Sequence, residues 1–159
     1  MMELLTALEH SAFAVWVRET NTVWAYPTVL TLHTVGLAVL VGANAAVDLR
    51  FLGFGRQIPL AEIERFFPAM WIGFWLNAIT GAMLFTVDPT TKGVAHIFMI
   101  KLALIAVGVM LIVLLRRAVY GRGPEAATVT SSAKAFAALS LLVWAAATAA
   151  GRLQAYITL

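Results

Sequence analysis

Four long apolar segments constrain the fold more than any other feature of the chain. They run at about residues 24–47, 68–87, 94–115 and 135–157, and each approaches or exceeds the roughly 20 residues that a helix needs to cross a bilayer. Because hydrocarbon offers no partners for backbone N–H and C=O groups, such segments must be helical. The sequence therefore predicts an all-α integral membrane four-helix bundle, with residues 1–159 forming a single transmembrane domain.

The composition agrees with that prediction. Of the 159 residues, 62% are hydrophobic and 12% are charged, whereas a soluble domain is nearer one half and one quarter. A water-soluble or disordered chain is thereby excluded, and the lipid bilayer is the expected partner. The absence of cysteine excludes disulfides, thiolate zinc sites and iron–sulfur clusters. Basic residues sit at the membrane edges rather than in one patch, so no nucleic-acid partner is expected.

The N-terminal segment is too short to cross the membrane. Residues 3–17 carry apolar side chains at helical spacing, interrupted by Glu3, Thr6, Glu9 and His10. This pattern predicts a short interfacial amphipathic helix. A signal peptide is not expected, because acidic residues rather than basic ones precede the first apolar run.

Lysine and arginine predict the orientation. The 48–67 and 116–134 connections together carry seven basic residues: Arg50, Arg56, Arg65, Arg116, Arg117, Arg122 and Lys134. The remaining four are divided between the other side and the spans, so the two basic connections are expected in the cytoplasm. Both termini then face the periplasm from a bacterial inner membrane. Trp24, Tyr26 and Tyr156 fit an outer aromatic belt.

Small residues predict close helix packing in the first two spans. They are Ala38, Gly42 and Ala46 in the first span, and Gly73 and Gly81 in the second. Spacing of four residues, or a multiple of four, aligns small side chains on one face and lets backbones approach. We interpret them as ordinary bundle-packing positions.

Three spans bring cationic or titratable side chains to one level of the membrane. At about 1.5 Å per residue, His33, Lys101 and Arg152 lie roughly 8–14 Å below the outer surface. His96 is near the outer mouth of the third span, and His10 of the interfacial helix could cap the same region. Because ionisable groups inside a span are costly, each is a candidate functional residue.

Each candidate also has a structural interpretation. Lys101 and Arg152 have stems long enough to reach the headgroups. His96 and His10 are equally compatible with surface positions, and Asp48 with Arg50 is interpreted as an ion pair at the inner headgroup boundary. His33 lies too deep for its short side chain to reach the headgroups, so its ring nitrogens require a partner inside the bundle.

Three kinds of partner are open for His33. Asn77 and Thr80 on the second span are the available protein side chains; a metal ion and haem iron are the others. We favour a haem b electron-transfer or redox accessory protein, in which His96 or His10 supplies a second imidazole. In this hypothesis Lys101 and Arg152 hold the propionates. The predicted cofactor-binding residues are His33, His96, His10, Lys101, Arg152, Asn77, Trp144 and Tyr156.

The last span carries polar and aromatic residues at a regular spacing that includes Arg152, at the membrane depth of His33 and Lys101. Ser140, Trp144, Thr148, Arg152 and Tyr156 recur every four residues and form one slowly drifting stripe. On the first span, His33, Gly36, Leu40 and Asn44 share a face, which Asp48 continues.

Other functions stay open. His10, His33 and His96 could instead bind copper or another metal in a metal-handling membrane protein. Lys101 with Arg152 could hold an anion or a quinone, and a structural subunit without chemistry is the remaining alternative. No catalytic motif indicates an enzyme acting by itself. Expected protein partners are a periplasmic redox or metal-carrier protein, a second copy of the chain, or a larger membrane complex.

Several short runs resemble one family of small bacterial four-span membrane proteins. The runs are Trp24-Ala25-Tyr26-Pro27, His33 to Ala38, Gly42, Asp48 to Gly53, Gly81 with Leu84-Phe85, Phe98 to Lys101, and Gly151-Arg152 with Tyr156. The resemblance implies the four-span fold. The family's recurrent first-span His, third-span Lys and last-span Gly-Arg match His33, Lys101 and Gly151-Arg152. The architecture is also similar to CopD-type copper-resistance membrane domains and haem b membrane cytochromes.

Overall fold

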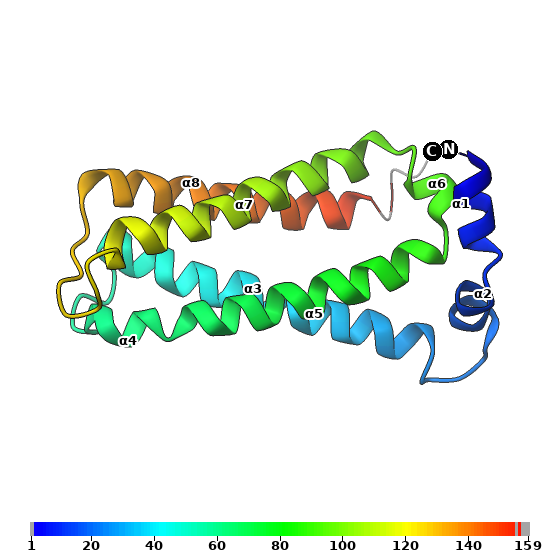
Figure 1. The fold of residues 1–159 in the computed structure, drawn as a ribbon, viewed down its shortest axis with the longest axis horizontal. Helices are drawn as coiled ribbons and strands as arrows, with labels where there is room; N and C mark the ends of the chain where they lie inside the picture. Colours follow the sequence, from blue (N-terminus) through cyan, green and yellow to red (C-terminus); the bar gives the residue numbers. More distant parts are fainter. Residues whose placement is uncertain (1, 155, 157–159) are drawn as a thin grey trace.

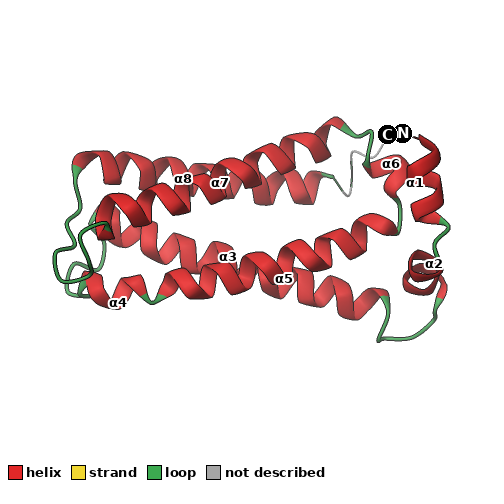
Figure 2. Cartoon of the chain, viewed as in Figure 1, coloured by secondary structure: helices red, strands yellow, loops and turns green. Residues whose placement is uncertain are grey.

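The computed structural model describes residues 2–154 and 156, and regular structure in that part of the chain is entirely helical (Figure 2). Four long helices lie side by side (Figure 1): α3 (Tyr26–Leu52), α5 (Phe66–Thr86), α7 (His96–Tyr120) and α8 (Ser131–Leu153). Each is long and apolar enough to cross a membrane, α5 together with the short helix that precedes it. The predicted all-α four-helix bundle is confirmed, and the apolar helices indicate a multi-pass membrane protein.

The helix ends differ from the predicted spans because helices continue beyond the apolar stretch. The first was expected to end near residue 47, but α3 continues to Leu52 and ends at Gly53, whose φ of 110° favours glycine. The last was expected to begin near residue 135, but α8 begins at Ser131, where the Thr130 side chain accepts a hydrogen bond from the Ala133 N–H. Hydrophobicity marks the membrane core, whereas caps mark the helix ends.

The two ends of the bundle have different characters. One end, which we call the basic end, carries the α7–α8 loop and the α3–α5 connection with its short helix α4 (Leu60–Glu64). The other, the capped end, carries α1 (Met2–Glu9), α2 (Ala12–Glu19) and α6 (Pro89–Lys92), which lie across the ends of the long helices (Figure 1).

The predicted single interfacial helix over residues 3–17 is wrong in one respect, because the segment forms two helices. The break falls at His10 and Ser11, where the Ser11 hydroxyl accepts a hydrogen bond from the Ala14 N–H and starts α2. A serine at this position offers the backbone a helix start, which competes with continuation of α1.

Polar contacts tie α1 and α2 to the bundle. The Thr90 hydroxyl on α6 donates to the Glu9 carboxylate at 2.6 Å. Arg18 of α2 lies 3.8 Å from the same carboxylate and 3.5 Å from the carbonyl oxygen of Val87. The N-terminal helices therefore cover the capped end rather than lying free of the long helices.

The long helices pack in the order α5–α3–α8–α7, and the ring is open on one side. Helix α3 packs extensively against α5 and less against α8, and α8 packs against α7, whereas α5 and α7 make few contacts in the described part of the chain. Aromatic pairs bridge this side at its two ends. Phe85 stacks on Phe98 with ring centroids 5.1 Å apart at the capped end, and Phe67 meets Tyr120 edge-on at 5.8 Å at the basic end.

Most of the hydrophobic core lies in the half of the bundle toward the basic end. There, large side chains from three of the long helices, α3, α5 and α7, are almost completely buried, and α8 contributes Ala133 and Ala137; the large ones include Val47, Phe51, Phe67, Met70, Leu115 and Val119.

The tightest helix contact joins α3 to α5 through two glycines. A Cβ on Gly73 would lie 2.7 Å from the backbone nitrogen of Leu40, and one on Gly36 would lie 2.8 Å from that of Asn77. The spacing of four residues had predicted that α3 packs through Ala38 and Gly42. Both residues are exposed, so that face of α3 is wrong, although small residues do bring the two helices together.

Replacing Gly73 by alanine is expected to destabilise the protein by about 1–3 kcal/mol, because its Cβ would meet backbone rather than a movable side chain. The matched control is Gly42→Ala, since no described atom lies within 4 Å of a Cβ there. That change should be neutral or stabilising by up to about 1 kcal/mol. Detergent-induced unfolding followed by circular dichroism measures both. Equal effects at the two positions would contradict the assigned α3–α5 contact.

Candidate functional site

His33 is held at the α3–α5 interface, three residues from Gly36. Its Nδ1 lies 3.0 Å from the backbone oxygen of Asn77 and 3.1 Å from the hydroxyl of Thr80. These are the two protein partners that the sequence offered. Gly81 provides the space for the ring, because a Cβ there would lie 3.0 Å from Cε1 of His33.

These contacts select a tautomer of the neutral ring. The backbone oxygen of Asn77 can only accept, so Nδ1 carries the hydrogen and Nε2 carries the lone pair. Thr80 also acts as an acceptor here, because its hydroxyl donates to the Leu76 carbonyl at 2.6 Å.

Asn77 also holds the backbone of α3 at this level. Its Nδ2 donates to the carbonyl oxygen of His33 at 2.8 Å and lies 3.5 Å from Nε2. The second distance is at the limit of a hydrogen bond, so Nε2 is only weakly engaged by the protein.

Lys101 approaches the same level from α7. It is half-buried, and its Cε and Nζ lie 3.6 and 3.8 Å from where a Cβ on Gly151 of α8 would be. Glycine at that position leaves room for the lysine stem. Two polar groups thus lie at this level: His33 with Asn77 and Thr80 on the α3–α5 pair, and Lys101 beside Gly151 on the α7–α8 pair. We call these five residues the His33–Lys101 site.

Four other predicted site residues lie at the surface. His10, His96, Arg152 and Tyr156 are all exposed, and Tyr156 follows the end of α8 with 82% of its surface accessible. None of them has a hydrogen bond to His33 in the described part of the chain. The stripe on α8 is therefore interior at Ser140 and Trp144 but exposed at its outer end. A repeat of four drifts by about 40° per step around the helix, and the buried positions at that end are Ala147, Ala150 and Gln154 instead.

Trp144 is buried, but against α7 rather than in the expected cofactor site with His33. Its ring packs on Gly108 of α7, where a Cβ would lie 2.8 Å from Cε2. Its indole Nε1 is buried without a hydrogen-bond partner in the described part of the chain. Trp144 serves the α7–α8 contact, and no contact with His33 is present among its described neighbours.

Metal-ligating residues do not cluster. Within residues 2–154 and 156, no three His, Asp or Glu side chains lie close enough to hold one ion. The predicted three-histidine set His10, His33 and His96 is therefore not assembled, because two members lie outside the packed interior.

A second polar group, unrelated to His33, joins α3 to α8 toward the basic end. Asp48 is 0% exposed, and its Oδ2 accepts a hydrogen bond of 2.5 Å from the Asn44 amide. The same amide nitrogen lies 2.9 Å from the Ser140 hydroxyl. The other oxygen, Oδ1, has no partner among the described residues.

The interpretation of Asp48 and Arg50 as a headgroup ion pair is wrong. Arg50 instead donates to the carbonyl oxygens of Ile58 and Arg56, at 2.8 and 3.2 Å. The repeat of four from Leu40 through Asn44 to Asp48 places the carboxyl on the buried face of α3. That spacing was the available signal, since α3 continues as a helix past the apolar span.

Asp48→Asn is expected to leave stability unchanged or to raise it, because the amide keeps the shape and the hydrogen bond but removes the possibility of an uncompensated buried charge. Asp48→Ala should instead cost about 1–3 kcal/mol, since it leaves the Asn44 amide short of a partner. Unfolding in detergent compares the two variants. If Asp48→Asn lost as much stability as Asp48→Ala, the carboxyl itself would be required.

No family model, curated protein or solved structure matches this chain.

Proposed function

We propose that the protein is a membrane haem b protein for electron transfer or a redox accessory role, with His33 as the iron ligand. The observation that carries the proposal is the hydrogen bond from His33 Nδ1 to the Asn77 backbone oxygen. Ligating histidines commonly donate their other ring N–H to a backbone carbonyl, which fixes the tautomer and orients the ring. The lone pair at Nε2 is then the available ligand.

Charge supports the same proposal. Lys101 supplies a half-buried cation from the opposite helix pair, beside Gly151. A haem carries propionate carboxylates, and such groups require cationic partners when they lie below the headgroups. Arg152 is not assigned this role, because it is exposed on the last turn of α8.

The packing order favours entry of a planar group from one side. Helices α5 and α7 make the fewest backbone contacts of the neighbouring long helices, so a macrocycle entering between them would separate fewer helix contacts than on the other sides.

The donor set favours haem over copper. One deep imidazole and one cation suit haem, whereas a copper site needs several nitrogen or sulfur ligands together. Among the described residues no such histidine group is assembled, and His96 and His10 are exposed. We therefore propose His33 as the one interior axial ligand. The bound haem would exchange single electrons with a redox partner protein at the capped end.

The test is the absorption spectrum of protein purified from haem-replete cells. We expect a Soret band that His33→Ala abolishes and that His96→Ala, the matched control, leaves in place. Lys101→Met should weaken haem retention, whereas Arg152→Gln should be nearly silent because that side chain is exposed.

Two results would contradict the proposal. A Soret band of equal intensity in wild type and His33→Ala would remove His33 as the ligand. A colourless preparation with stoichiometric copper would instead favour the metal-handling alternative, and a colourless, metal-free one would favour the structural subunit.

The proposed location is the bacterial inner membrane, with the capped end and both termini in the periplasm. The support is the excess of Lys and Arg at the basic end. A periplasm-active reporter fused after Leu159 should be active, and the same reporter placed in the α7–α8 loop after Gly123 should be inactive. The opposite pattern would reverse the orientation and put the redox partner in the cytoplasm.

A further inference from the structure

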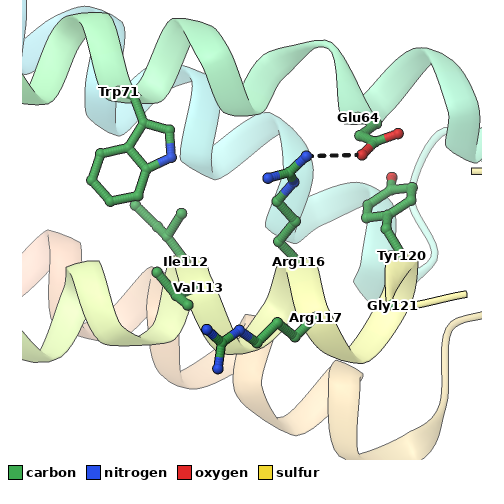
Figure 3. Close-up of a pocket in the computed structure, with 8 residues that line it drawn as sticks. All are labelled: Glu64, Trp71, Ile112, Val113, Arg116, Arg117, Tyr120 and Gly121. Carbon is green, nitrogen blue, oxygen red and sulfur yellow. Dashed lines mark hydrogen bonds and ion pairs between the residues drawn. The ribbon is translucent and has the colours of Figure 1, made fainter. Parts of the chain in front are cut away.

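A cavity of about 290 Å³ lies at the basic end, far from the His33–Lys101 site (Figure 3). It lies between α7 and the α4–α5 segment, on the same side of the bundle where α5 and α7 make few contacts. In a bilayer this side opens laterally toward lipid, at the level where the helices leave the hydrocarbon. None of the residues that line it takes part in the proposed haem function.

Two consecutive arginines give the cavity its charge. Arg116 extends across it to Glu64 of α4, with Nη2 3.3 Å from the carboxylate (Figure 3). Its guanidinium also lies 5.9 Å from the centre of the Phe67 ring. Arg117 is exposed and has no ion pair or hydrogen bond with the described residues. Both arginines line the cavity, but Figure 3 shows the Arg116 guanidinium beside Glu64 and the Arg117 guanidinium on the other side of α7. The side chain of Arg117 must therefore turn for both guanidiniums to meet one ligand.

The rest of the cavity is apolar. Trp71 of α5 faces Ile112 and Val113 of α7 across it (Figure 3). Ile112 precedes Arg116 by one helical turn, so this apolar part lies about 6 Å deeper toward the centre of the bundle. A phospholipid has the same order of groups: its phosphate would meet the cations at the membrane boundary, and its acyl chain would meet the apolar surface one turn deeper.

We propose that this cavity binds an anionic phospholipid, with the phosphate on Arg116 and Arg117 and the start of an acyl chain against Trp71, Ile112 and Val113. Basic pockets between transmembrane helices at the cytoplasmic side suit such headgroups. Inorganic phosphate would use the arginines without the apolar wall, and a neutral quinone would use the wall without two cations. A phospholipid uses both.

Glu64 sets the affinity of the site. Its carboxylate competes with the phosphate for Arg116, and the ion pair must be shared or broken when lipid binds. Glu64→Gln removes the competing charge while keeping a side chain of the same size. The proposal therefore requires that this variant bind anionic lipid more tightly than wild type.

The test measures phosphatidylglycerol bound to the purified full chain in a neutral detergent, by native mass spectrometry. Arg116→Gln with Arg117→Gln should reduce binding by about tenfold or more, since each arginine near an anionic headgroup contributes roughly fivefold. The matched control is Arg56→Gln with Arg122→Gln, which makes the same change of charge at the basic end but outside the cavity. Val113→Trp, which fills the apolar part without changing charge, should also reduce binding.

Each other outcome overturns the proposal in a defined way. Equal losses in the two arginine pairs would mean general attraction of anionic lipid to a basic surface. Unchanged binding in Val113→Trp would leave a phosphate site without an acyl site. A short-chain quinone could also displace the bound lipid. If the variant without Arg116 and Arg117 still bound that quinone, the cavity would be assigned to a neutral ligand.

Discussion

The backbone contact between Gly36 and Gly73 sets the geometry on which the rest of the bundle depends. With no Cβ at either position, α3 and α5 approach until backbone atoms touch, and van der Waals packing of this kind is the main source of helix association in lipid. The contact also fixes the axial register of the two helices. It places Asn77 beside Gly36, so that His33, three residues away, meets the Asn77 carbonyl and the Thr80 hydroxyl. The position of the deepest imidazole in the chain is therefore a consequence of two missing side chains.

The two halves of the bundle solve different problems. Toward the basic end, large apolar side chains and the Asn44–Asp48–Ser140 group join all four helices or the α3–α8 pair. Toward the capped end, small residues and polar side chains predominate, and the short helices α1, α2 and α6 cover the helix ends. The large apolar side chains are thus concentrated toward the basic end, whereas the Gly36–Gly73 backbone contact lies close to His33.

The sequence predicted the number and kind of the long helices, because the hydrocarbon allows few alternatives to a helix. It also named Asn77 and Thr80 as the available protein partners of His33, beside a metal ion and the favoured haem iron, because polar residues are rare inside spans. Other features needed the structure. Spacing of four selected Ala38 and Gly42 as a packing face, but the face actually used is set by pairing with α5 and starts at Gly36. Asp48 was assigned to the headgroups because the apolar run ends just before it, yet α3 continues and buries it. Arg152 was grouped with Trp144 by a repeat of four, but that repeat drifts by about 80° over these two steps, and the buried face at the end of α8 carries Ala150 and Gln154.

The order of packing makes the bundle a pair of hairpins joined along a single seam. One hairpin is α3 with α5, the other is α7 with α8, and the seam is the α3–α8 contact, in which Asn44 reaches Ser140. The two hairpins therefore join along the α3–α8 contact, and α5 and α7 lie on the opposite side of the bundle. His33 belongs to the α3–α5 hairpin and Lys101 to the α7–α8 hairpin. Glu64, just before α5, and Arg116 of α7 are likewise on opposite hairpins. A different angle between the two hairpins would change both separations. The Glu64–Arg116 ion pair crosses the α5–α7 side, but the Arg116 side chain is more than half exposed, so the pair adds little to the aromatic contacts that join the hairpins there.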